Sequence, residues 1–314
     1  MNYLIIDKLQ PIIGEKIAYA SKRIIEELDK KNIPHSLTYL NELEFEFING
    51  ETLIKAKGQD ITKYTHIIFR GHDLHSELQY QFKKYIVDYI DQYNVLNPEK
   101  KILVQNEKTI KKLPYYNKIA LALFCSQNSI PYFNTYFRTD GNYLAHRDVL
   151  NAYPLIMKEY SGANRIELIN GEKKIKKNVF KINNADGYRQ EHLKELNYSR
   201  MFIQEFSSSK IDYRIFVSMG NIVGGWKREA KEGFMTVKKG KYSAYNKPGT
   251  KIQELALNVA QKLKADFLAV DIMEIENKPL LQEISMNPGF KAYETKIKEG
   301  TVNIAKLIVE SFPN

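Results

Sequence analysis

The sequence is poor in cysteine. Its 314 residues include one, Cys125, within the apolar stretch IALALFCSQ. A single thiol excludes a disulfide framework and a cysteine-rich zinc site, and it favours a reducing compartment. For Cys125 itself, the role of a small buried apolar residue is favoured over that of a catalytic thiol.

Long apolar runs and targeting signals are also missing. No stretch contains the roughly 18–20 apolar residues that a membrane-spanning helix needs. The first residues, MNYLIID, lack the charged start and the long apolar run of a signal peptide. The sequence therefore predicts a cytoplasmic protein with no membrane partner.

The charge is strongly positive, at +10, but it is not concentrated. Short lysine clusters occur at 173–177 and 238–241, and neither is long enough to be a nucleic-acid-binding tail. No zinc-finger, RNA-recognition or basic-zipper pattern is present, so nucleic acid is not a favoured partner. A positive field favours small or peptidic anions instead, such as nucleotides, phosphates and acidic peptides.

The first third of the chain alternates strand-like and helical patterns, which is typical of a parallel sheet. The expected strands are 3–7, 36–40, 65–69 and 101–105, with helices at 14–31 and 76–91 and a hairpin turning at Asn49-Gly50. Arg70 follows the third strand directly. Ligands of open α/β sheets bind at the carboxyl ends of strands, so Arg70 is placed to meet an anion, although a surface arginine closing a loop is an equal alternative. His72 and His75 lack a third metal ligand nearby, which favours a polar loop.

The remainder of the chain is predicted to contain mainly antiparallel strands with few helices. Strands are expected at 155–159, 166–169, 201–206, 212–219 and 222–227, and helices at 116–127, 251–264 and 302–312. Cations recur along this part: Lys118 opens a helix, Lys158 and Arg228 end strands, and Arg214 lies within a strand. Singly each is a weak signal, because such side chains are usually solvated.

A hairpin near the C-terminus carries two acids in apolar strands. Asp271 lies at the centre of the strand 267–275, and Glu283 ends the strand 279–284, with Asn287 just beyond. A carboxylate inside an apolar strand is costly unless it is paired or binds a metal. Oxygen ligands of this kind suit Mg²⁺ and its phosphates. The alternative is that both acids lie on the solvent face of a half-exposed hairpin.

Taken in order, these segments resemble the ATP-grasp superfamily of carboxylate–amine ligases, and in particular its branch containing ribosomal protein S6 glutamate ligase and related peptide-modifying ligases. The segments that carry the resemblance are Asn117-Lys118 with Ser129-Ile130-Pro131, Ile156-Met157-Lys158, 201–206, Asp212 to Val217 (DYRIFV), Asp271, and Glu283 to Gly289. The resemblance is densest from Lys118 to Glu294.

The resemblance implies an α/β (α+β) fold. In this ATP-grasp fold an N-terminal Rossmann-like parallel α/β lobe (1–112) precedes two antiparallel α+β lobes (113–200 and 201–314) that clasp ATP. It implies ATP as cofactor together with two Mg²⁺ ions, or Mn²⁺ in their place. It is also compatible with a homo-oligomer.

The roles that the resemblance implies fall into four groups. Lys118 and Lys158 hold the ATP phosphates, with Arg165 adding charge in the phosphate loop. Gln204, Glu205 and Phe206 contact the nucleotide from the hinge strand. Arg214 and Arg228 stabilise the transferred phosphate and the tetrahedral intermediate. The metal ligands are Asp271, Glu283 and Asn287, and Arg70 in the first lobe faces the substrate.

Three departures from the family pattern stand out. The phosphate loop 161–165 has one glycine, where the family is richer. Aligned on Pro288-Gly289, the asparagine of the family falls on Ser285, so either Ser285 or Asn287 supplies the third metal oxygen, and Asn287 is favoured as the better ligand. The family segment RSN is replaced by residues 234–238, so glutamate does not follow as the substrate.

The leading hypothesis is an ATP-dependent ligase that forms an amide or peptide bond through an acyl phosphate, releasing ADP and phosphate. Its substrate would be an amino acid, a peptide or a protein with a carboxylate. The loops 161–165 and 228–241 are candidate lids. Two alternatives stay open: a kinase with the same fold, and a nucleotide-binding protein without ligase activity.

Overall fold

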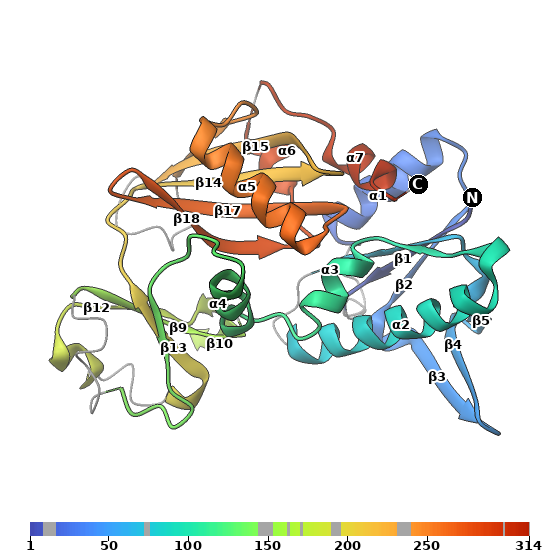
Figure 1. Ribbon diagram of the computed structural model, residues 1–314, viewed down its shortest axis with the longest axis horizontal. Helices are drawn as coiled ribbons and strands as arrows, with labels where there is room; N and C mark the ends of the chain where they lie inside the picture. The colour runs from blue at the N-terminus through green and yellow to red at the C-terminus, as the bar shows by residue number, and fades with distance from the viewer. Residues whose placement is uncertain are drawn as a thin grey trace.

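The computed structural model describes residues 1–8, 17–71, 76–143, 153–161, 164–169, 172–189, 196–230, 240–297 and 299–313. Side chains are described in all of these except 76–79, 164–169, 172–177 and 188–189. Three groups of elements, here called the first, central and third lobes, follow one another along the chain (Figure 1). In the described part, no helix combines the length and the apolar character needed to cross a bilayer.

The first lobe is a parallel sheet in the strand order β2-β1-β6-β7. Its strands are β1 (Tyr3–Asp7), β2 (His35–Tyr39), β6 (His66–Phe69) and β7 (Leu103–Val104), with α1 (Tyr19–Lys30) after β1 and α2 (Ser76–Leu96) after β6. Alternate residues of β1 enter different cores: Tyr3 and Ile5 pack with α1, whereas Leu4 and Ile6 pack with α2. A strand covered on both faces needs apolar residues at every position, which is why β1 reads as one apolar run.

A small antiparallel sheet is attached to this lobe. It contains β3 (Leu43–Ile48), β4 (Glu51–Ala56) and the short β5 (Gln59–Asp60). The turn between β3 and β4 is Asn49-Gly50, with φ of 54° and 79°. Both angles lie in the left-handed region that a tight hairpin turn requires, so the predicted hairpin is confirmed.

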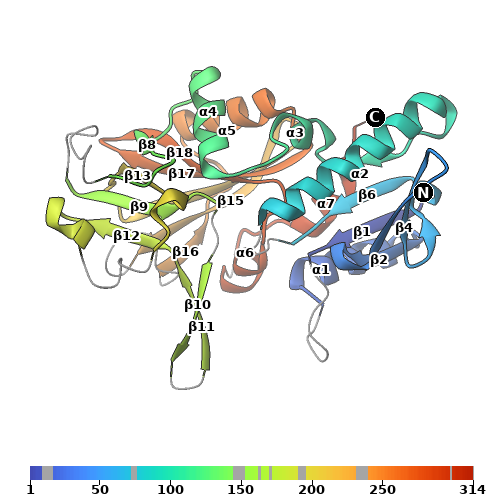
Figure 2. The ribbon, with the colours of Figure 1, turned by 90° about the horizontal axis from the view of Figure 1, so that it is seen from below.

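The central lobe is an antiparallel sheet in the order β12-β9-β13-β8. Its strands are β8 (Thr135–Phe137), β9 (Leu155–Glu159), β12 (Val179–Ile182) and β13 (Met201–Glu205), and α4 (Lys118–Gln127) precedes them. A hairpin of β10 (Asn164–Ile169) and β11 (Glu172–Lys177) projects from this lobe (Figure 2). Because β13 pairs with both β8 and β9, the sheet continues beyond residue 200, where the sequence suggested a boundary.

The third lobe is an antiparallel sheet in the order β16-β15-β14-β17-β18. Its strands are β14 (Ile211–Ser218), β15 (Asn221–Ala230), β16 (Gly240–Ala244), β17 (Phe267–Ile275) and β18 (Lys278–Ser285), with α5 (Thr250–Leu263), α6 (Lys291–Lys296) and α7 (Ile304–Glu310). The apolar face of α5 packs on one side of the sheet, against Tyr213, Ile215 and Val217 of β14. The other face of the sheet carries a second apolar cluster, which includes Phe216, Trp226 and Phe267, and the polar residues described below lie beside it. In the same cluster α7 packs back onto α1 of the first lobe.

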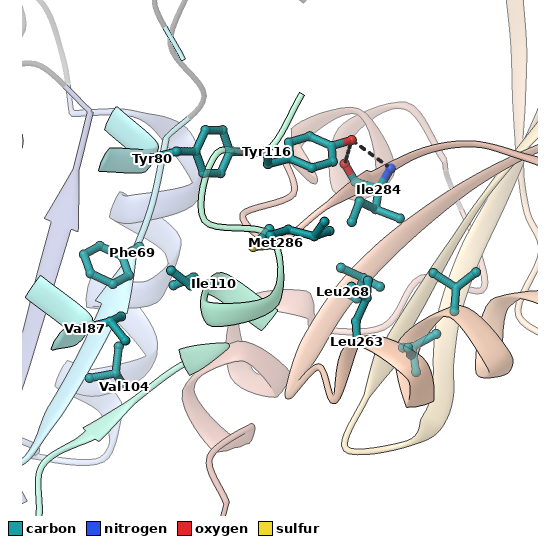
Figure 3. Close-up of a cluster of buried hydrophobic side chains, with 14 of the residues drawn as sticks. Phe69, Tyr80, Val87, Val104, Ile110, Tyr116, Leu263, Leu268, Ile284 and Met286 are labelled. Carbon is teal, nitrogen blue, oxygen red and sulfur yellow. Dashed lines mark hydrogen bonds between the residues drawn. The ribbon is translucent and has the colours of Figure 1, made fainter. Parts of the chain in front are cut away.

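The first and third lobes share one continuous apolar core (Figure 3). Phe69 and Val87 lie on the side of the first lobe and Leu268 on the side of the third, with residues of α3 (Glu107–Lys112) between them. The Tyr116 hydroxyl donates to the Ile284 carbonyl at 3.1 Å and accepts from the Ile284 N–H at 3.3 Å. The segment that leads into α4 is thereby bonded to the end of β18.

Asn106 joins the two lobes by hydrogen bonds. It is buried, directly after β7, with φ of 59°. Its Oδ1 accepts from the N–H groups of Asp266 and Phe267 at 2.9 and 3.1 Å, and its Nδ2 donates to the carbonyls of Phe267 and Met286 at 2.8 and 3.1 Å. One side chain thus fixes the start of β17 and the end of β18 against the first lobe.

We predict that Asn106→Ala lowers the thermal unfolding midpoint by several degrees. The change leaves buried backbone groups of Asp266 and Phe267 without their partner, and alanine tolerates the left-handed φ poorly, for a total cost of about 3 kcal/mol or more. Differential scanning calorimetry measures the shift. The matched control is Asn128→Ala, which removes one bond, to the Phe124 carbonyl, at the half-exposed end of α4. Equal midpoints for the two variants would contradict this role of Asn106.

Candidate functional site

A row of four residues crosses the third sheet. Asp271 of β17 lies opposite Glu283 of β18, Arg214 of β14 lies opposite Asp271, and Trp226 of β15 lies opposite Arg214. Residues that face each other in a ladder point to the same side of a sheet. Because the neighbouring β14 residue Ile215 packs under α5, the row points away from that helix. Strand pairing alone therefore gathers two acids and a cation on one face.

The pairing of β17 with β18 is irregular at these acids. The partner of Asp271 is Glu283, but the partner of Ile272 is Leu281, so Gln282 is an extra residue in β18. Such bulges bend a strand and redirect side chains, and they are frequent beside active sites.

Arg214 and Asp271 form a two-pronged ion pair. The arginine Nε donates to Oδ1 and Nη2 donates to Oδ2, both at 2.6 Å. The guanidinium also lies 5.0 Å from the centre of the Trp226 ring. Burial opposes the charge of Arg214, but the Asp271 carboxylate outweighs it and keeps the arginine pKa above its ordinary value. Arg214 therefore keeps its positive charge at any physiological pH.

Lys118 brings the central lobe to the same row. Its Nζ lies 2.9 Å from Oε1 of Glu283. Lys118 is the first residue of α4, and the Asn117 side chain caps the helix by accepting from the N–H groups of Ile119 and Ala120. The cap fixes where the helix begins, and so it fixes where Lys118 points.

A second ion pair lies beside the row. Arg228 of β15 faces Asp212 of β14, and its Nε donates to Asp212 Oδ1 at 2.9 Å while Nη2 bonds to Oδ2. Asp212 is two residues from Arg214, so both pairs lie on the same face. Burial raises the pKa of Asp212 even though Arg228 opposes the shift. The face therefore contains two arginines, each with its own carboxylate.

The hinge residues lie on the sheet of the central lobe. Lys158 of β9 donates to Gln204 Oε1 of β13 at 2.9 Å, and Gln204 Nε2 donates to Thr135 Oγ1 at the same distance. Gln204 also bonds to the buried Tyr132 hydroxyl, and Tyr132 forms a bridge to Leu281 of β18. This chain of contacts connects the strand of Lys158 to the strand of Glu283. No sequence pattern singled out Tyr132.

The last two hinge residues face other partners. The Glu205 carboxylate accepts from the backbone N–H and the side chain of Asn134, at 2.8 and 3.0 Å. The ammonium of Lys181 lies 4.4 Å from the centre of the Phe206 ring. Glu205 and Phe206 therefore lie at the end of β13, next to Gln204.

The structure separates the two candidates for the third metal oxygen. Ser285 faces Ala269 in β17, so strand alternation places it on the side of Asp271 and Glu283. Asn287 is buried beyond the end of β18, where its Oδ1 accepts from Lys83 at 2.7 Å and its Nδ2 donates to the Phe69 carbonyl at 2.9 Å. These contacts bind Asn287 to the first lobe.

Asp271 and Glu283 are better suited to Mg²⁺ than to a metal ion that is coordinated by protein side chains alone. In the described part of the chain, no cluster of three or more His, Cys, Asp or Glu side chains could hold a metal ion. Mg²⁺ is usually bound by one or two carboxylates, with phosphates and water completing its six ligands. Asp271 and Glu283 match that requirement when a nucleotide is present.

Arg70 lies apart from the row, buried where the first and third lobes meet. Its Nη2 donates to the Pro288 carbonyl at 2.7 Å, and burial lowers its pKa to about 10. Next to it is a lysine that the sequence analysis missed, Lys83, whose pKa burial lowers to about 8, with the charge of Arg70 acting in the same direction. The signal was present: Lys83 lies three residues after Tyr80 and four before Val87, on the apolar stripe of α2.

Four of the predicted features lie outside what the structure describes. They are the side chain of Arg165, which is located on β10; parts of the loops 161–165 and 228–241; residues 234–238; and His72 with His75.

Curated proteins with similar sequences are glutamate ligases by name. The probable alpha-L-glutamate ligase of Psychromonas ingrahamii is 31% identical over 116 residues, which is 36% of this chain and 37% of that protein. That of Vibrio vulnificus is 26% identical over 100 residues, or 31% and 33% of the two chains. The matched stretch thus spans about a third of the length of these relatives.

Solved structures match over nearly the whole chain. The RimK domain protein of Sphaerobacter thermophilus has a TM-score of 0.65 at 15% identity, covering 98% of this chain and 99% of its own. The RiPP-associated ATP-grasp ligase of Chryseobacterium gregarium, solved with ADP and a leader and core peptide, has a TM-score of 0.65 at 14% identity, covering 99% and 96%. The ATP-grasp ligase PsnB, solved with a minimal precursor, Mg and ADP, has a TM-score of 0.61 at 10% identity, covering 98% and 96%. The predicted ATP-grasp fold is confirmed.

The sequence profile of the RimK-like ATP-grasp domain matches residues 123–312, which is more than half of the chain. The matched range contains both ion pairs and the acid hairpin, and Lys118 lies just before it. This chain therefore belongs to the RimK-like ATP-grasp family.

Proposed function

We propose that this protein is an ATP-dependent carboxylate–amine ligase that forms an amide or peptide bond and releases ADP and phosphate. The observation that carries the proposal is the row in which Arg214 and Lys118 neutralise Asp271 and Glu283 on one sheet face. Phosphoryl transfer needs positioning and charge neutralisation more than covalent chemistry from the protein. Cations from two lobes and two metal-binding acids supply both requirements.

The nucleotide would lie between the central and third sheets. Lys158 and Lys118 hold the phosphates, one from each side, with Arg165 as a further cation. Gln204, Glu205 and Phe206 provide the hinge contacts at the end of β13. The substrate residues would then come from segment 1–112 and the metal residues from segment 201–314. The nucleotide residues would come from segment 113–200 and from the end of β13, which belongs to the sheet of the central lobe.

Asp271 and Glu283 would hold one or two Mg²⁺ ions, with Ser285 or Asn287 as the third oxygen ligand. Bound there, the metal neutralises phosphate charge. We now favour Ser285, because it shares the face of the two acids whereas Asn287 is bonded to Lys83 and Phe69. Mn²⁺, which also prefers oxygen ligands, is the natural substitute.

Arg214 and Arg228 would act on the reacting groups. Ligation has two steps: a substrate carboxylate becomes an acyl phosphate, and an amine then displaces phosphate. Negative charge builds up in both, first on the transferred phosphoryl group and then on the tetrahedral intermediate. Arginines held in place by Asp271 and Asp212 stabilise that charge without reorganising. Exclusion of water protects the acyl phosphate from hydrolysis.

The acid substrate is proposed to be an amino acid or a peptide. Structural neighbours were solved with precursor peptides, and the curated relatives are named glutamate ligases. The test is to incubate the protein with ATP, Mg²⁺ and pools of amino acids and peptides, and to measure ADP and phosphate. Release of both that requires an acid and an amine is expected. Phosphate retained on the product would indicate a kinase, and binding of ATP without any turnover would also contradict a ligase.

We predict that Asp271→Asn and Glu283→Gln each reduce ADP release about 100-fold or more while the protein stays folded, because each removes a charge from the metal site. Steady-state assays with circular dichroism as the folding check measure both effects. The matched control is Glu274→Gln, on the opposite face of β17, where the carboxylate accepts from the Tyr213 hydroxyl at 2.9 Å. Full activity in either site variant would refute the metal assignment.

We predict that Lys158→Ala weakens ATP binding about 10- to 100-fold, since a charge-assisted bond to a phosphate contributes roughly 1.5–3 kcal/mol. Isothermal titration calorimetry with MgATP measures the change. Lys55→Ala is the control for the lost positive charge, because Lys55 pairs with Glu46 in the small sheet of the first lobe, at 2.6 Å. If the two variants bind ATP equally well, Lys158 does not contact the phosphates.

A further inference from the structure

Arg70 is buried with part of its hydrogen-bonding capacity unused. The residue is 1% exposed, and its one side-chain hydrogen bond among the described residues joins Nη2 to the Pro288 carbonyl. Nε and Nη1 have no hydrogen-bond partner there. Leaving buried donors unbonded costs roughly 1–3 kcal/mol each, and more for a charged group. An arginine with unbonded buried donors therefore lowers the free energy of unfolding.

A second buried cation lies beside it. Lys83 is 3% exposed, donates to Asn287, and lies 5.1 Å from the centre of the Tyr80 ring. The negative charge of Asp7 raises the pKa of both cations, against the effect of burial. The Asp7 carboxylate itself accepts from the Ser21 hydroxyl at 2.5 Å and from the Lys8 N–H at 2.8 Å. Among the described residues, Arg70, Lys83 and Asp7 together carry one more positive than negative charge. Buried charge is normally paired, so this cluster is suited to an added anion.

The cluster adjoins the candidate active site through two consecutive carbonyls. Arg70 donates to the carbonyl of Pro288, and Arg214 Nη1 lies 3.4 Å from the carbonyl of Gly289. Gly289 is exposed, and a Cβ added to it would meet no atom within 4 Å. An anion could therefore extend from the open space at Gly289 toward Arg70 while the rest of its molecule stays beside Arg214.

We propose that Arg70 and Lys83 bind a carboxylate of the ligase substrate other than the one that is activated, where the first and third lobes meet. That this carboxylate belongs to a substrate rests on the proposed function of the protein. The planar guanidinium offers two parallel N–H groups that match the two oxygens of a carboxylate, and Lys83 adds a point charge. The α-carboxylate of an amino acid or an acidic group of a peptide has this chemistry. Such a contact selects acidic substrates and orients them toward Arg214.

The test measures carboxylate binding without ATP, so it does not depend on turnover. The thermal midpoint of the full chain is recorded with glutarate, with the neutral analogue glutaramide at equal concentration, and with inorganic phosphate, all at matched ionic strength. We expect glutarate to raise the wild-type midpoint by a few degrees more than glutaramide or phosphate does. In Arg70→Met and in Lys83→Met this difference should disappear, while calorimetric ATP affinity stays within about twofold of the wild-type value.

The matched control is Lys84→Met, which removes the same charge from the next residue of α2, where Lys84 pairs with Asp88 at 2.5 Å. This variant should keep the full glutarate response. If Arg70→Met does not fold, Arg70→Lys takes its place. This variant keeps the charge but loses the two parallel N–H groups of the guanidinium, so it should bind glutarate at least tenfold more weakly than the wild type.

The proposal is overturned if glutaramide protects as well as glutarate, or if the variants at Arg70 and Lys83 keep the glutarate response. A larger response to phosphate that depends on Arg70 overturns it as well, since the site would then take a phosphate. A glutarate response in a protein that shows no ligation would leave the carboxylate site standing and refute the ligase function. Ligation without any glutarate response would support the ligase function and refute the carboxylate site.

Discussion

The ion pair between Arg214 and Asp271 is the interaction on which the candidate site depends. The two residues are direct partners in the pairing of β14 with β17, so their proximity follows from the register of the sheet. A shift of one residue would turn Asp271 into the core under α5, where a carboxylate has no counter-charge. The apolar residues on either side, such as Val270 and Ile272, make that shift costly because they would lose their own burial. Hydrophobic alternation thus holds the charges in place.

The same constraint extends beyond the third sheet. In the proposed function, Glu283 acts together with Lys118 and Lys158, which both belong to the central lobe and must be held at a fixed distance from Glu283. The contacts that fix this distance are largely apolar or between backbone groups: Tyr116 bonds to Ile284, and the Leu281 N–H donates to the Pro131 carbonyl at 2.9 Å. Asn106 does the same for the first lobe. A charged site between lobes therefore depends on neutral contacts at their junctions.

Much of this arrangement was predictable from the sequence because it depends on short-range patterns. The two apolar strands of the hairpin 267–285 and the acids they carry were evident from the sequence, but the pairing of Asp271 with Glu283 was not. Regular pairing from the turn, where Ile275 faces Lys278, would put Gln282 opposite Asp271, and the extra residue in β18 is what brings Glu283 there. The pairing of β14 with β17, which brings Arg214 to Asp271, is likewise a contact between distant segments. The boundaries of β1 and β17 agree with the prediction because both strands are apolar runs that end at polar or turn residues, whereas the helix expected at 76–91 continues to Leu96. The helix expected at 116–127 begins two residues later, at Lys118, because the Asn117 side chain caps it there.

What could not be predicted depends on contacts between distant segments. From the sequence, the choice between Ser285 and Asn287 depended on which side chain is the better metal ligand. In the structure it depends on where the side chains point, because that of Asn287 bonds to Lys83 and Phe69. No local pattern contains that information. Lys83 was overlooked because a single lysine on an apolar stripe usually extends its charge to water. Its burial becomes evident only when α2, β6 and the segment after β18 come together.

The two kinds of cation in this protein are stabilised in opposite ways, and the difference bears on what each can do. Arg214 and Arg228 are paired with carboxylates, so their charge is fixed and their positions are rigid. Such groups are suited to stabilising charge that appears briefly during a reaction. Among the described residues, the carboxylate that acts on Arg70 and Lys83 is that of Asp7, which bonds elsewhere, so an added anion would offset the cost of burying their charge. A buried site that is incomplete in this way gains the most from binding, because the ligand removes a cost that the protein already bears. The first lobe then contributes selectivity for acidic substrates, while the third lobe contributes the chemistry.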